Sequence, residues 1–461
     1  MSLQFIEGGA GTGKTTAVMA RLDESVTATP LAEHQRVLAL TKMHGSRRRV
    51  RDRLGKIAGL AGRFESATVD SFAWRIVCRW RSLARVLCGP APTGFNEICE
   101  QAGRLLEEPH VQRWVASTFP VVIIDELQDS KEGQLRVLKG LAAQCECITA
   151  GDWFQDLDGE TTCASIEWAR QQASPTVLTT IHRTRTPGLL AAATALRDQQ
   201  AVVPARGFTI KGVAAYGPGA WEVALKITQW IGHGTVAVIS PVTAARSKFV
   251  REVVERVNSG PMGKQQQIGP FKLFWEAGND EQIGRICDEV RLPNEDDAVV
   301  GGQTLALTGG GSIGMVRDWL SRQRRLFGKR EFKAGEIREA VRQLVQRSRG
   351  HAHHEERRLT AMSIHQAKNR EFDRVIVLWP YEVSGSDERK RRLAYNAITR
   401  ARHEVHIVVQ NASRLSQSPF VPGANSGSTT SRRRSSPTVA KEGAAPVKPA
   451  TALKSTRTER L

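Results

Sequence analysis

Short apolar runs and helical patterns alternate along the first 411 residues of the chain. The runs are mostly β-branched and are bounded by polar or turn-forming residues, which is typical of buried strands. The expected strands are Leu3–Ile6, Val37–Leu40, Val121–Ile124, Cys147–Ala150, Val177–Thr180, Val236–Ile239, Val375–Leu378 and His406–Val409. Helical patterns lie between them, as in Gly335–Arg347. Strands separated by helices predict an α/β fold with parallel sheets built from βαβ units.

The 461 residues are enough for several domains. We expect one parallel-sheet domain over residues 1–174, with an insertion near 73–119. A second one is expected over 175–411, with an insertion near 259–350. Residues 412–461 carry nine Lys and Arg against two acids, and they have one aromatic residue. This composition predicts a disordered basic tail, which serves either as a nucleic-acid tether or as a solvated end.

The chain is strongly basic. It has 66 Lys and Arg against 47 Asp and Glu, a net charge of +19. This excess favours a polyanionic partner, with nucleic acid first and an anionic membrane surface second. No apolar stretch approaches the length of a membrane span, and the N-terminus lacks the pattern of a secretory signal. We therefore expect a cytoplasmic protein of a bacterium or phage, associated with the nucleoid.

The seven cysteines are odd in number and widely spread, which does not indicate a disulfide framework or a metal cluster. Cys145 and Cys147 are the closest pair, and we expect them to be buried packing residues.

A glycine-rich loop follows the first expected strand and precedes a helical pattern. It fits the phosphate-loop pattern G-x-x-x-x-G-K-[ST] with the residues Gly8, Gly9, Ala10, Gly11, Thr12, Gly13, Lys14 and Thr15. Backbone amides of such a loop surround phosphate oxygens at the positive end of a helix. Lys14 is expected to reach the β- and γ-phosphates of ATP, and the Thr15 hydroxyl to bind Mg²⁺. The loop therefore predicts a P-loop nucleotide hydrolase.

An acidic pair follows the expected strand Val121–Ile124. Asp125 would emerge at the carboxyl end of the strand, where open α/β sheets bind ligands. Asp125 is expected to hold Mg²⁺, and Glu126 to act as general base on the attacking water.

From Asp125 to Asp129 the sequence resembles the DExQD box of superfamily 1 helicases of the UvrD/Rep type. Other segments resemble further motifs of this family, in the family's order. They are Val37–Thr41, Thr68–Phe72, Gly151–Gln155, His182–Thr184, Val236–Pro241 with Arg246, Met362–Phe372 and Leu393–Arg402. The resemblance runs from about residue 3 to residue 410, and it implies two RecA-like domains with small helical insertions.

The resemblance also implies roles for individual residues around ATP. Gln155 would sense the γ-phosphate, and Glu371 would lie near the ribose. Arg183 and Arg400 would reach the γ-phosphate from the second domain and neutralise charge during phosphoryl transfer. The implied nucleic-acid contacts are Thr41, Arg47, Arg48, Thr68, Arg246 and His365. Arg53 lies on the same basic helix as Arg47 and Arg48.

The implied function is ATP-driven 3′–5′ movement on single-stranded DNA with duplex unwinding, in DNA repair or recombination. ATP and Mg²⁺ are the implied cofactors, and single-stranded DNA, duplex DNA and a protein partner are the implied partners, without a membrane.

Several positions depart from the family pattern. No glutamine motif precedes the phosphate loop, since Gln4 lies in a different context. Thr16 and His182 replace the arginine and tyrosine expected beside adenine. The expected DNA-stacking aromatics are absent after Thr41 and after Gln155. The list of departures is completed by Asp70, in place of a histidine, and Asn369, in place of a glycine. Two alternatives therefore stay open. One is a DNA-stimulated ATPase switch or partner subunit, for example in an anti-phage system, and the other is an RNA helicase.

Overall fold

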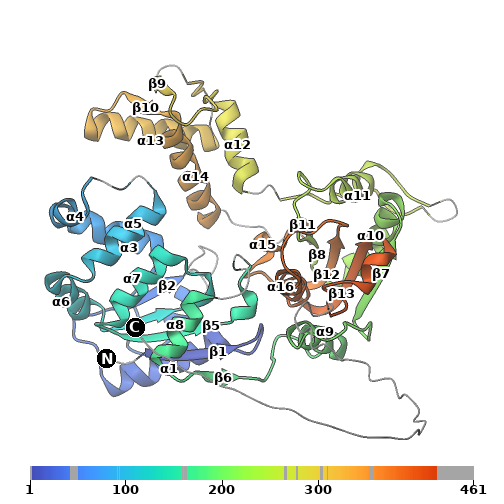
Figure 1. Ribbon diagram of the computed structural model, residues 1–461, viewed down its shortest axis with the longest axis horizontal. Helices are drawn as coiled ribbons and strands as arrows, with labels where there is room; N and C mark the ends of the chain where they lie inside the picture. Colours follow the sequence, from blue (N-terminus) through green and yellow to red (C-terminus); the bar gives the residue numbers. More distant parts are fainter. Residues whose placement is uncertain are drawn as a thin grey trace, which may run out of the picture. The chain divides into compact units, whose positions relative to one another are not determined.

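The computed structural model describes residues 3–41, 50–90, 92, 94–157, 159, 163–263, 267–276, 279–301, 305–308, 310–351 and 358–422. The predicted nucleic-acid contacts Arg47 and Arg48 lie outside the described residues, as do residues 423–461 of the predicted tail. In the described residues two parallel sheets, each flanked by helices, form the framework (Figure 1).

The first sheet has six parallel strands in the order β3-β2-β4-β5-β1-β6. In chain order they are β1 (Leu3–Gly8), β2 (Val37–Thr41), β3 (Phe64–Thr68), β4 (Val121–Ile124), β5 (Glu146–Gly151) and β6 (Thr176–Leu178). β2 and β4 are buried over their whole length, as expected for strands covered on both faces. Because all strands run the same way, the carboxyl ends of β1 and β4 lie at one edge of the sheet, with only β5 between these two strands.

Helices cover this sheet and fill the predicted insertion. They are α1 (Lys14–Ala28), α3 (Val69–Arg79), α4 (Arg81–Cys88), α5 (Phe95–Leu105), α6 (Pro109–Thr118), α7 (Glu132–Ala142) and α8 (Ala164–Gln172). Phe72, Val111 and Val115 join strand residues in one apolar core, so the α3–α6 segment packs on the sheet instead of standing apart. Cys145 and Cys147 are buried in the same core, as predicted.

The second sheet has five parallel strands in the order β11-β8-β12-β13-β7. The strands are β7 (Phe208–Val213), β8 (Val236–Ser240), β11 (Leu359–Ser363), β12 (Phe372–Trp379) and β13 (Ala401–Gln410). Its helices are α9 (Pro187–Arg197), α10 (Tyr216–Trp230), α11 (Lys248–Ser259), α15 (Ile364–Ala367) and α16 (Asp387–Ile398). We call the sheet of β1–β6 with its helices the first lobe, and the sheet of β7, β8 and β11–β13 with its helices the second lobe.

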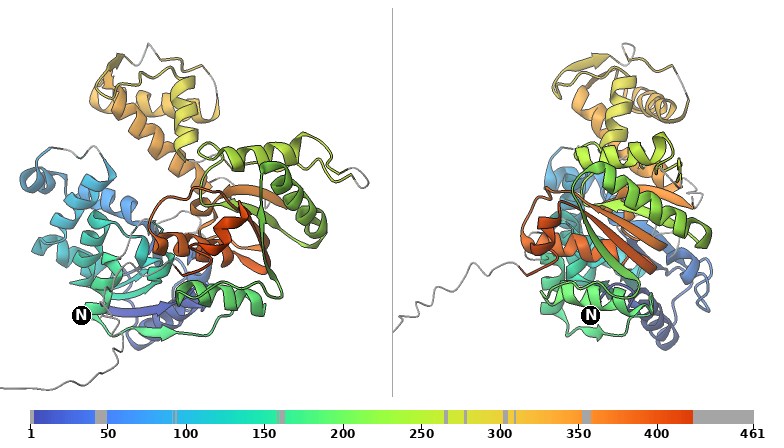
Figure 2. Two further views of the ribbon diagram at one scale, coloured as in Figure 1. Left: turned by 45° about the vertical axis from the view of Figure 1, so that its right-hand side comes forward. Right: turned by 90° about the vertical axis from the view of Figure 1, so that its right-hand side faces the viewer.

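A small helical unit is inserted in the second lobe between β8 and β11 (Figure 2). It contains α12 (Asn279–Glu289), β9 (Val299–Gly301), α13 (Gly311–Phe327), β10 (Glu331–Lys333) and α14 (Ala334–His351). β9 and β10 pair antiparallel, and the unit has an apolar core of its own. The chain leaves and returns at adjacent positions, since Glu276 N donates to Ala361 O at 2.7 Å and Ala361 N donates to Phe274 O at 3.0 Å.

The predicted disordered tail begins too early. A short 3₁₀ helix, η4, spans Ala412–Ser416, and Phe420 is buried with its ring 5.6 Å from that of Trp379. Val202 N also donates to Phe420 O at 2.8 Å. The prediction of disorder for residues 412–422 is therefore wrong, because the single aromatic residue of this segment finishes the core of the second lobe.

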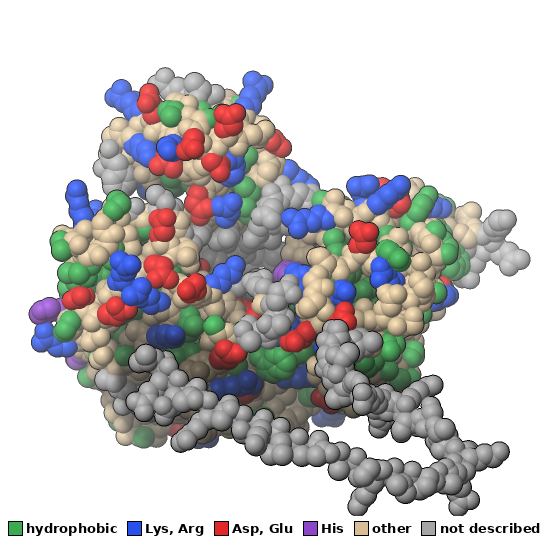
Figure 3. Space-filling model, in the orientation of Figure 1, with side chains coloured by type: hydrophobic (Ala, Val, Ile, Leu, Met, Phe, Trp, Pro, Cys, Tyr) green, Lys and Arg blue, Asp and Glu red, His purple; other side chains and the backbone are tan. Residues whose placement is uncertain are grey.

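The face of the molecule seen in Figure 3 is rich in charge but mixed in sign. Figure 3 shows lysine and arginine side chains interspersed with acidic ones over the visible face. Over the described part of the chain, no helix is both long and apolar enough to cross a membrane.

Candidate active site

The glycine-rich loop joins β1 to α1 and encloses the amine of Lys14. Gly11 and Gly13 have φ angles of 78° and 86°, which a side chain strongly disfavours, so the glycines permit this loop conformation. Lys14 Nζ donates to the carbonyl oxygens of Gly8 at 2.9 Å and of Gly9 at 3.1 Å. Lys14 is buried, and its amine therefore lies within the loop at the N-terminus of α1.

The acidic pair follows β4 at the same edge of the sheet. Thr15 Oγ1 donates to Asp125 Oδ2 at 3.2 Å, which brings together a hydroxyl and a carboxylate. Such oxygens are the ligands that Mg²⁺ prefers, so Thr15 and Asp125 fit the cation expected there. Burial and the neighbouring charge of Glu126 raise the pKa of Asp125 to about 6.

Glu126 is held beside Asp125 by an unusual backbone and by Gln128. Its φ is 59°, and Gln128 Nε2 donates to Glu126 Oε2 at 2.6 Å. Burial alone would raise the pKa of Glu126, but the charges of Lys14 and Lys368 and the hydrogen bond from Gln128 outweigh it and lower the pKa. Glu126 is therefore ionised at neutral pH, as a general base must be.

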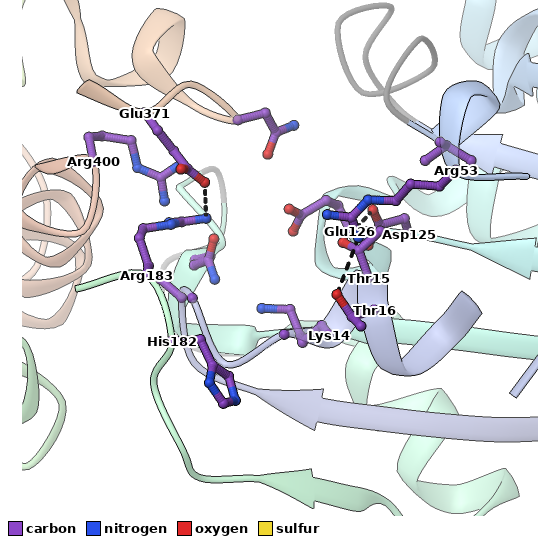
Figure 4. A pocket seen from close by; sticks show the side chains of 16 residues that line it. Lys14, Thr15, Thr16, Arg53, Asp125, Glu126, His182, Arg183, Glu371 and Arg400 are labelled. Carbon is purple, nitrogen blue, oxygen red and sulfur yellow. Dashed lines mark hydrogen bonds and ion pairs between the residues drawn. The ribbon is translucent and has the colours of Figure 1, made fainter. Parts of the chain in front are cut away.

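Two arginines lie together opposite the phosphate loop (Figure 4). Arg183 Nη2 pairs with Glu371 Oε1 at 2.9 Å, and Arg183 Nη1 donates to Thr399 O at 3.0 Å. Arg400 is buried, and its Nε donates to Asn396 O at 3.0 Å. Burial and the charge of Arg183 lower the pKa of Arg400 to about 10, so the Arg400 side chain remains cationic at neutral pH.

These groups line one cavity of about 290 Å³. The first lobe and the segment between β6 and α9 line it together with the second lobe. The lining residues are Ala10, Gly11, Gly13, Lys14, Thr15, Thr16, Val50, Arg53, Asp125, Glu126, Gln155, His182, Arg183, Asn369, Glu371 and Arg400. Of the residues predicted for ATP, Mg²⁺ or catalysis, Gly8, Gly9 and Thr12 are not among them. Gly8 and Gly9 contact Lys14 instead, and Thr12 Oγ1 donates to Gly9 O at 2.9 Å.

Arg53 is a lining residue that the sequence analysis did not assign to the nucleotide. Its Nη1 donates to Thr16 Oγ1 at 3.4 Å, from the helix that was expected to face nucleic acid. The sequence of a basic helix does not show whether its arginines contact the nucleotide or a nucleic acid, because both ligands are polyanions. Asn369 also lines the cavity, and its φ of 63° explains why a glycine is usual at this position.

Gln155 connects the cavity to the body of the first lobe and to the second lobe. Its Nε2 donates to Asp152 Oδ2 at 2.8 Å, and its carbonyl oxygen accepts from Lys368 Nζ at 3.0 Å. Lys368 also forms a buried ion pair with Asp129. The last acid of the DExQD box is thus paired across the two lobes.

The predicted nucleic-acid contacts differ in accessibility. Arg246 and His365 are exposed. Thr41 and Thr68 are buried, and Thr68 Oγ1 accepts from Ser71 N at 3.2 Å as the cap of α3. These placements bring neither threonine side chain to the surface, and the roles of all four residues stay predictions.

Two departures from the family pattern have structural partners. Asp70 Oδ1 accepts from Gln134 Nε2 at 2.7 Å, which ties α3 to α7. Gln4 Nε2 donates to Glu146 Oε1 at 3.0 Å and therefore lies away from the cavity.

Comparison with known families gives two matches. The model of an AAA domain matches residues 1–211, which contain the phosphate loop, the acidic pair and Gln155. The model of the UvrD-like helicase C-terminal domain matches residues 358–408, which contain Glu371 and Arg400. No curated protein matches the chain.

The two domain types imply nucleotide binding, nucleic-acid binding and an ATP-hydrolysing enzyme. They divide between them the residues that meet around the cavity. Together the two matches support a UvrD/Rep-like helicase of superfamily 1.

Proposed function

We propose that the protein hydrolyses ATP to move 3′–5′ along single-stranded DNA and to unwind duplex DNA. One observation carries the proposal. The cavity joins a phosphate loop and an acidic pair from the first lobe to Arg183, Glu371 and Arg400 on its other side. A polyphosphate is the ligand whose charge and shape suit such a set of groups.

In this proposal the side chains divide the chemistry of hydrolysis. Lys14 and the loop amides bind the β- and γ-phosphates, and Thr15 and Asp125 hold Mg²⁺. A cation there neutralises phosphate charge. Glu126 takes a proton from the water whose oxygen attacks the γ-phosphorus. The bond to the bridging oxygen breaks, and ADP and phosphate leave. Arg183 and Arg400 stabilise the charge on the transferring group, and Gln155 orients it.

Movement would follow because the groups that complete the site belong to different lobes. A bound triphosphate draws the arginines toward the phosphate loop, and product release removes that attraction. DNA would be gripped alternately by contacts on each lobe. The proposed contacts are Thr41, Arg47, Arg48 and Thr68 on residues 1–174, and Arg246 and His365 on residues 175–411. The basic residues after 422 add a non-specific, salt-dependent attraction.

Two measurements test the proposal. ATP turnover is measured with and without single-stranded DNA, and strand displacement is measured on duplexes with a 3′ or a 5′ tail. We expect DNA to stimulate turnover and the 3′-tailed duplex to be unwound. Unwinding from the 5′ tail only would contradict the polarity, and preferential stimulation by a matched RNA would assign the enzyme to RNA.

A second candidate is an ATPase switch that binds DNA without unwinding it. The burial of Thr41 and Thr68, together with the absence of the expected stacking aromatics, favours it. DNA-stimulated turnover without displacement on either tail would support this candidate. The proposal includes a protein partner and a role in repair, recombination or defence. Purification of the protein from its source cell would test for the partner, and DNA-damage and phage-challenge assays would separate the three roles.

A further inference from the structure

Arg197, the last residue of α9, lies outside every motif of the sequence analysis, yet it reaches across to the first lobe. Its Nη1 donates to Asp152 Oδ1 at 2.9 Å and Oδ2 at 3.1 Å, and to Tyr395 Oη at 3.2 Å. Its guanidinium also lies 5.4 Å from the ring centroids of both Phe154 and Tyr395. The Arg197 side chain, which belongs to the second lobe, thus contacts the turn after β5 in the first lobe and also contacts α16 in its own lobe.

Asp152 carries the contact from Arg197 toward the site of hydrolysis. The carboxylate is fully buried, and its Oδ2 also accepts from Gln155 Nε2 at 2.8 Å. Its backbone N donates to Gln128 Oε1 at 3.0 Å, and Gln128 in turn donates to Glu126. A change in the position of Asp152 would therefore be felt by Gln155 and Glu126, both of which line the cavity.

Tyr395 carries the second contact to the phosphate loop. Its hydroxyl accepts from Ala10 N at 2.8 Å, and Arg197 donates to the same oxygen. The Tyr395 ring packs against Phe154 at 5.1 Å between centroids, in an edge-to-face arrangement. Arg197 consequently fixes one carboxylate and one hydroxyl, each of which fixes a separate part of the nucleotide site.

We propose that Arg197 is a positioning residue for hydrolysis, which holds Gln155 through Asp152 and the phosphate loop through Tyr395. The guanidinium does not line the cavity, so it acts through these partners. Lysine in its place keeps the charge, but its side chain is shorter than that of arginine and lacks the planar guanidinium that lies beside the rings of Phe154 and Tyr395, so it cannot hold Asp152 and Tyr395 in the same way. This inference rests on the proposed ATP hydrolysis.

The test is a double-mutant cycle between Arg197→Lys and Gln155→Ala, with steady-state ATP hydrolysis as the first measurement. We expect Arg197→Lys to lower kcat about tenfold with KM changed less than about threefold. In the Gln155→Ala background the same change should cost clearly less than about tenfold, because one of the two groups that Arg197 positions is gone while the phosphate loop is still held through Tyr395. Binding of a fluorescent ADP analogue should remain within about threefold of the wild type.

Arg374→Lys is the matched control. Arg374 pairs with Glu404 at 2.9 Å inside the second lobe and lies outside the cavity, so its turnover should match the wild type. Equal losses from Arg197→Lys in both backgrounds would overturn the inference, and so would a rise in KM alone. The inference would also be overturned if Arg197→Lys and Arg374→Lys lowered both the melting temperature and kcat to the same extent. The loss of turnover would then follow from lost stability. Failure of the proposed function is seen separately, as absence of turnover in the wild-type protein.

Discussion

The two lobes meet in two different ways, in a packed region and in a cavity. In the packed region Ala10, Phe154 and Leu157 of the first lobe share one apolar core with residues of the second lobe. Two ion pairs cross between the lobes there or nearby, a partly buried one from Arg197 to Asp152 and a buried one from Lys368 to Asp129. In the cavity, by contrast, the charged groups bond mainly to their own side.

The pairs in the cavity show this difference directly. Thr15 bonds to Asp125 and Gln128 to Glu126 within the first lobe. On the opposite side Arg183 bonds to Glu371. Contacts between side chains of the two lobes therefore hold the packed region together, whereas the two sides of the cavity are joined through the backbone, where His182 N donates to Gly11 O at 2.8 Å. The comparison teaches that the packed region can act as a hinge while the cavity closes on its substrate.

The largest expected effect comes from removing the positive charge of Lys14, which lies on the first-lobe side of the cavity. Lys14→Ala should lower ATP turnover by at least about 10³-fold, because the amine that neutralises the β- and γ-phosphates is lost. A steady-state phosphate-release assay checks this, with the exposed Lys139→Ala on α7 as control. Normal turnover in Lys14→Ala would remove the phosphate loop from the mechanism.

The next effect tests whether the opposite side of the cavity acts in catalysis. Arg400→Ala should lower kcat about 10³-fold, since a guanidinium stabilises charge that develops in the transition state. The affinity for a fluorescent ADP analogue should stay within about threefold. Parallel losses of binding and turnover would show that Arg400 serves binding and not the transition state.

Arg53 should give a smaller and different effect. Arg53→Met should raise the KM for ATP about tenfold with little change in kcat, because the residue adds a charge to the wall near Thr16 without facing the arginines. Arg51→Met, an exposed residue on the same helix, is the control. The assays are run without nucleic acid. Identical KM values for the two variants would return Arg53 to the nucleic-acid surface.

The smallest effect is a pH dependence of cation binding. The raised pKa of Asp125, about 6, means that the carboxyl is ionised above this pH and takes up a proton below it. Turnover at limiting Mg²⁺ should therefore fall as pH drops through about 6. Higher Mg²⁺ competes with the proton and should move the midpoint to lower pH. Profiles of kcat/KM from pH 5 to 8 at two Mg²⁺ concentrations check this, and coincident midpoints would contradict it.

The sequence predicted the central strands well and the edge strands poorly. β3, β7 and β11, which were not predicted as strands, all lie at sheet edges. β3 (Phe-Glu-Ser-Ala-Thr) and β11 (Leu-Thr-Ala-Met-Ser) mix apolar with polar and small residues, so their strand pattern is weak even though β11 is buried over its whole length. β7 alternates between buried and exposed positions over Phe208–Val213.

The site was predictable where a function depends on a local pattern. The phosphate loop and the acidic pair each follow a strand directly, so their positions follow from the strand itself. Arg53 and Arg197 could not be predicted in this way, because each reaches its partners from a separate element and its destination depends on how that element packs. Phe420 was missed for a related reason, since one buried ring can order a segment whose composition is otherwise polar.

The chain enters and leaves the helical unit at adjacent positions, and this has a consequence for how the size of the unit can vary among related proteins. Residue 276, where the chain departs, is already hydrogen-bonded to residue 361 in β11, where the chain rejoins the sheet. The entropy of closing the loop between them grows only slowly with its length. Inserted units of quite different size can therefore be exchanged at this position while the two sheets stay intact, which makes it a suitable place for evolution or an engineer to add new target recognition.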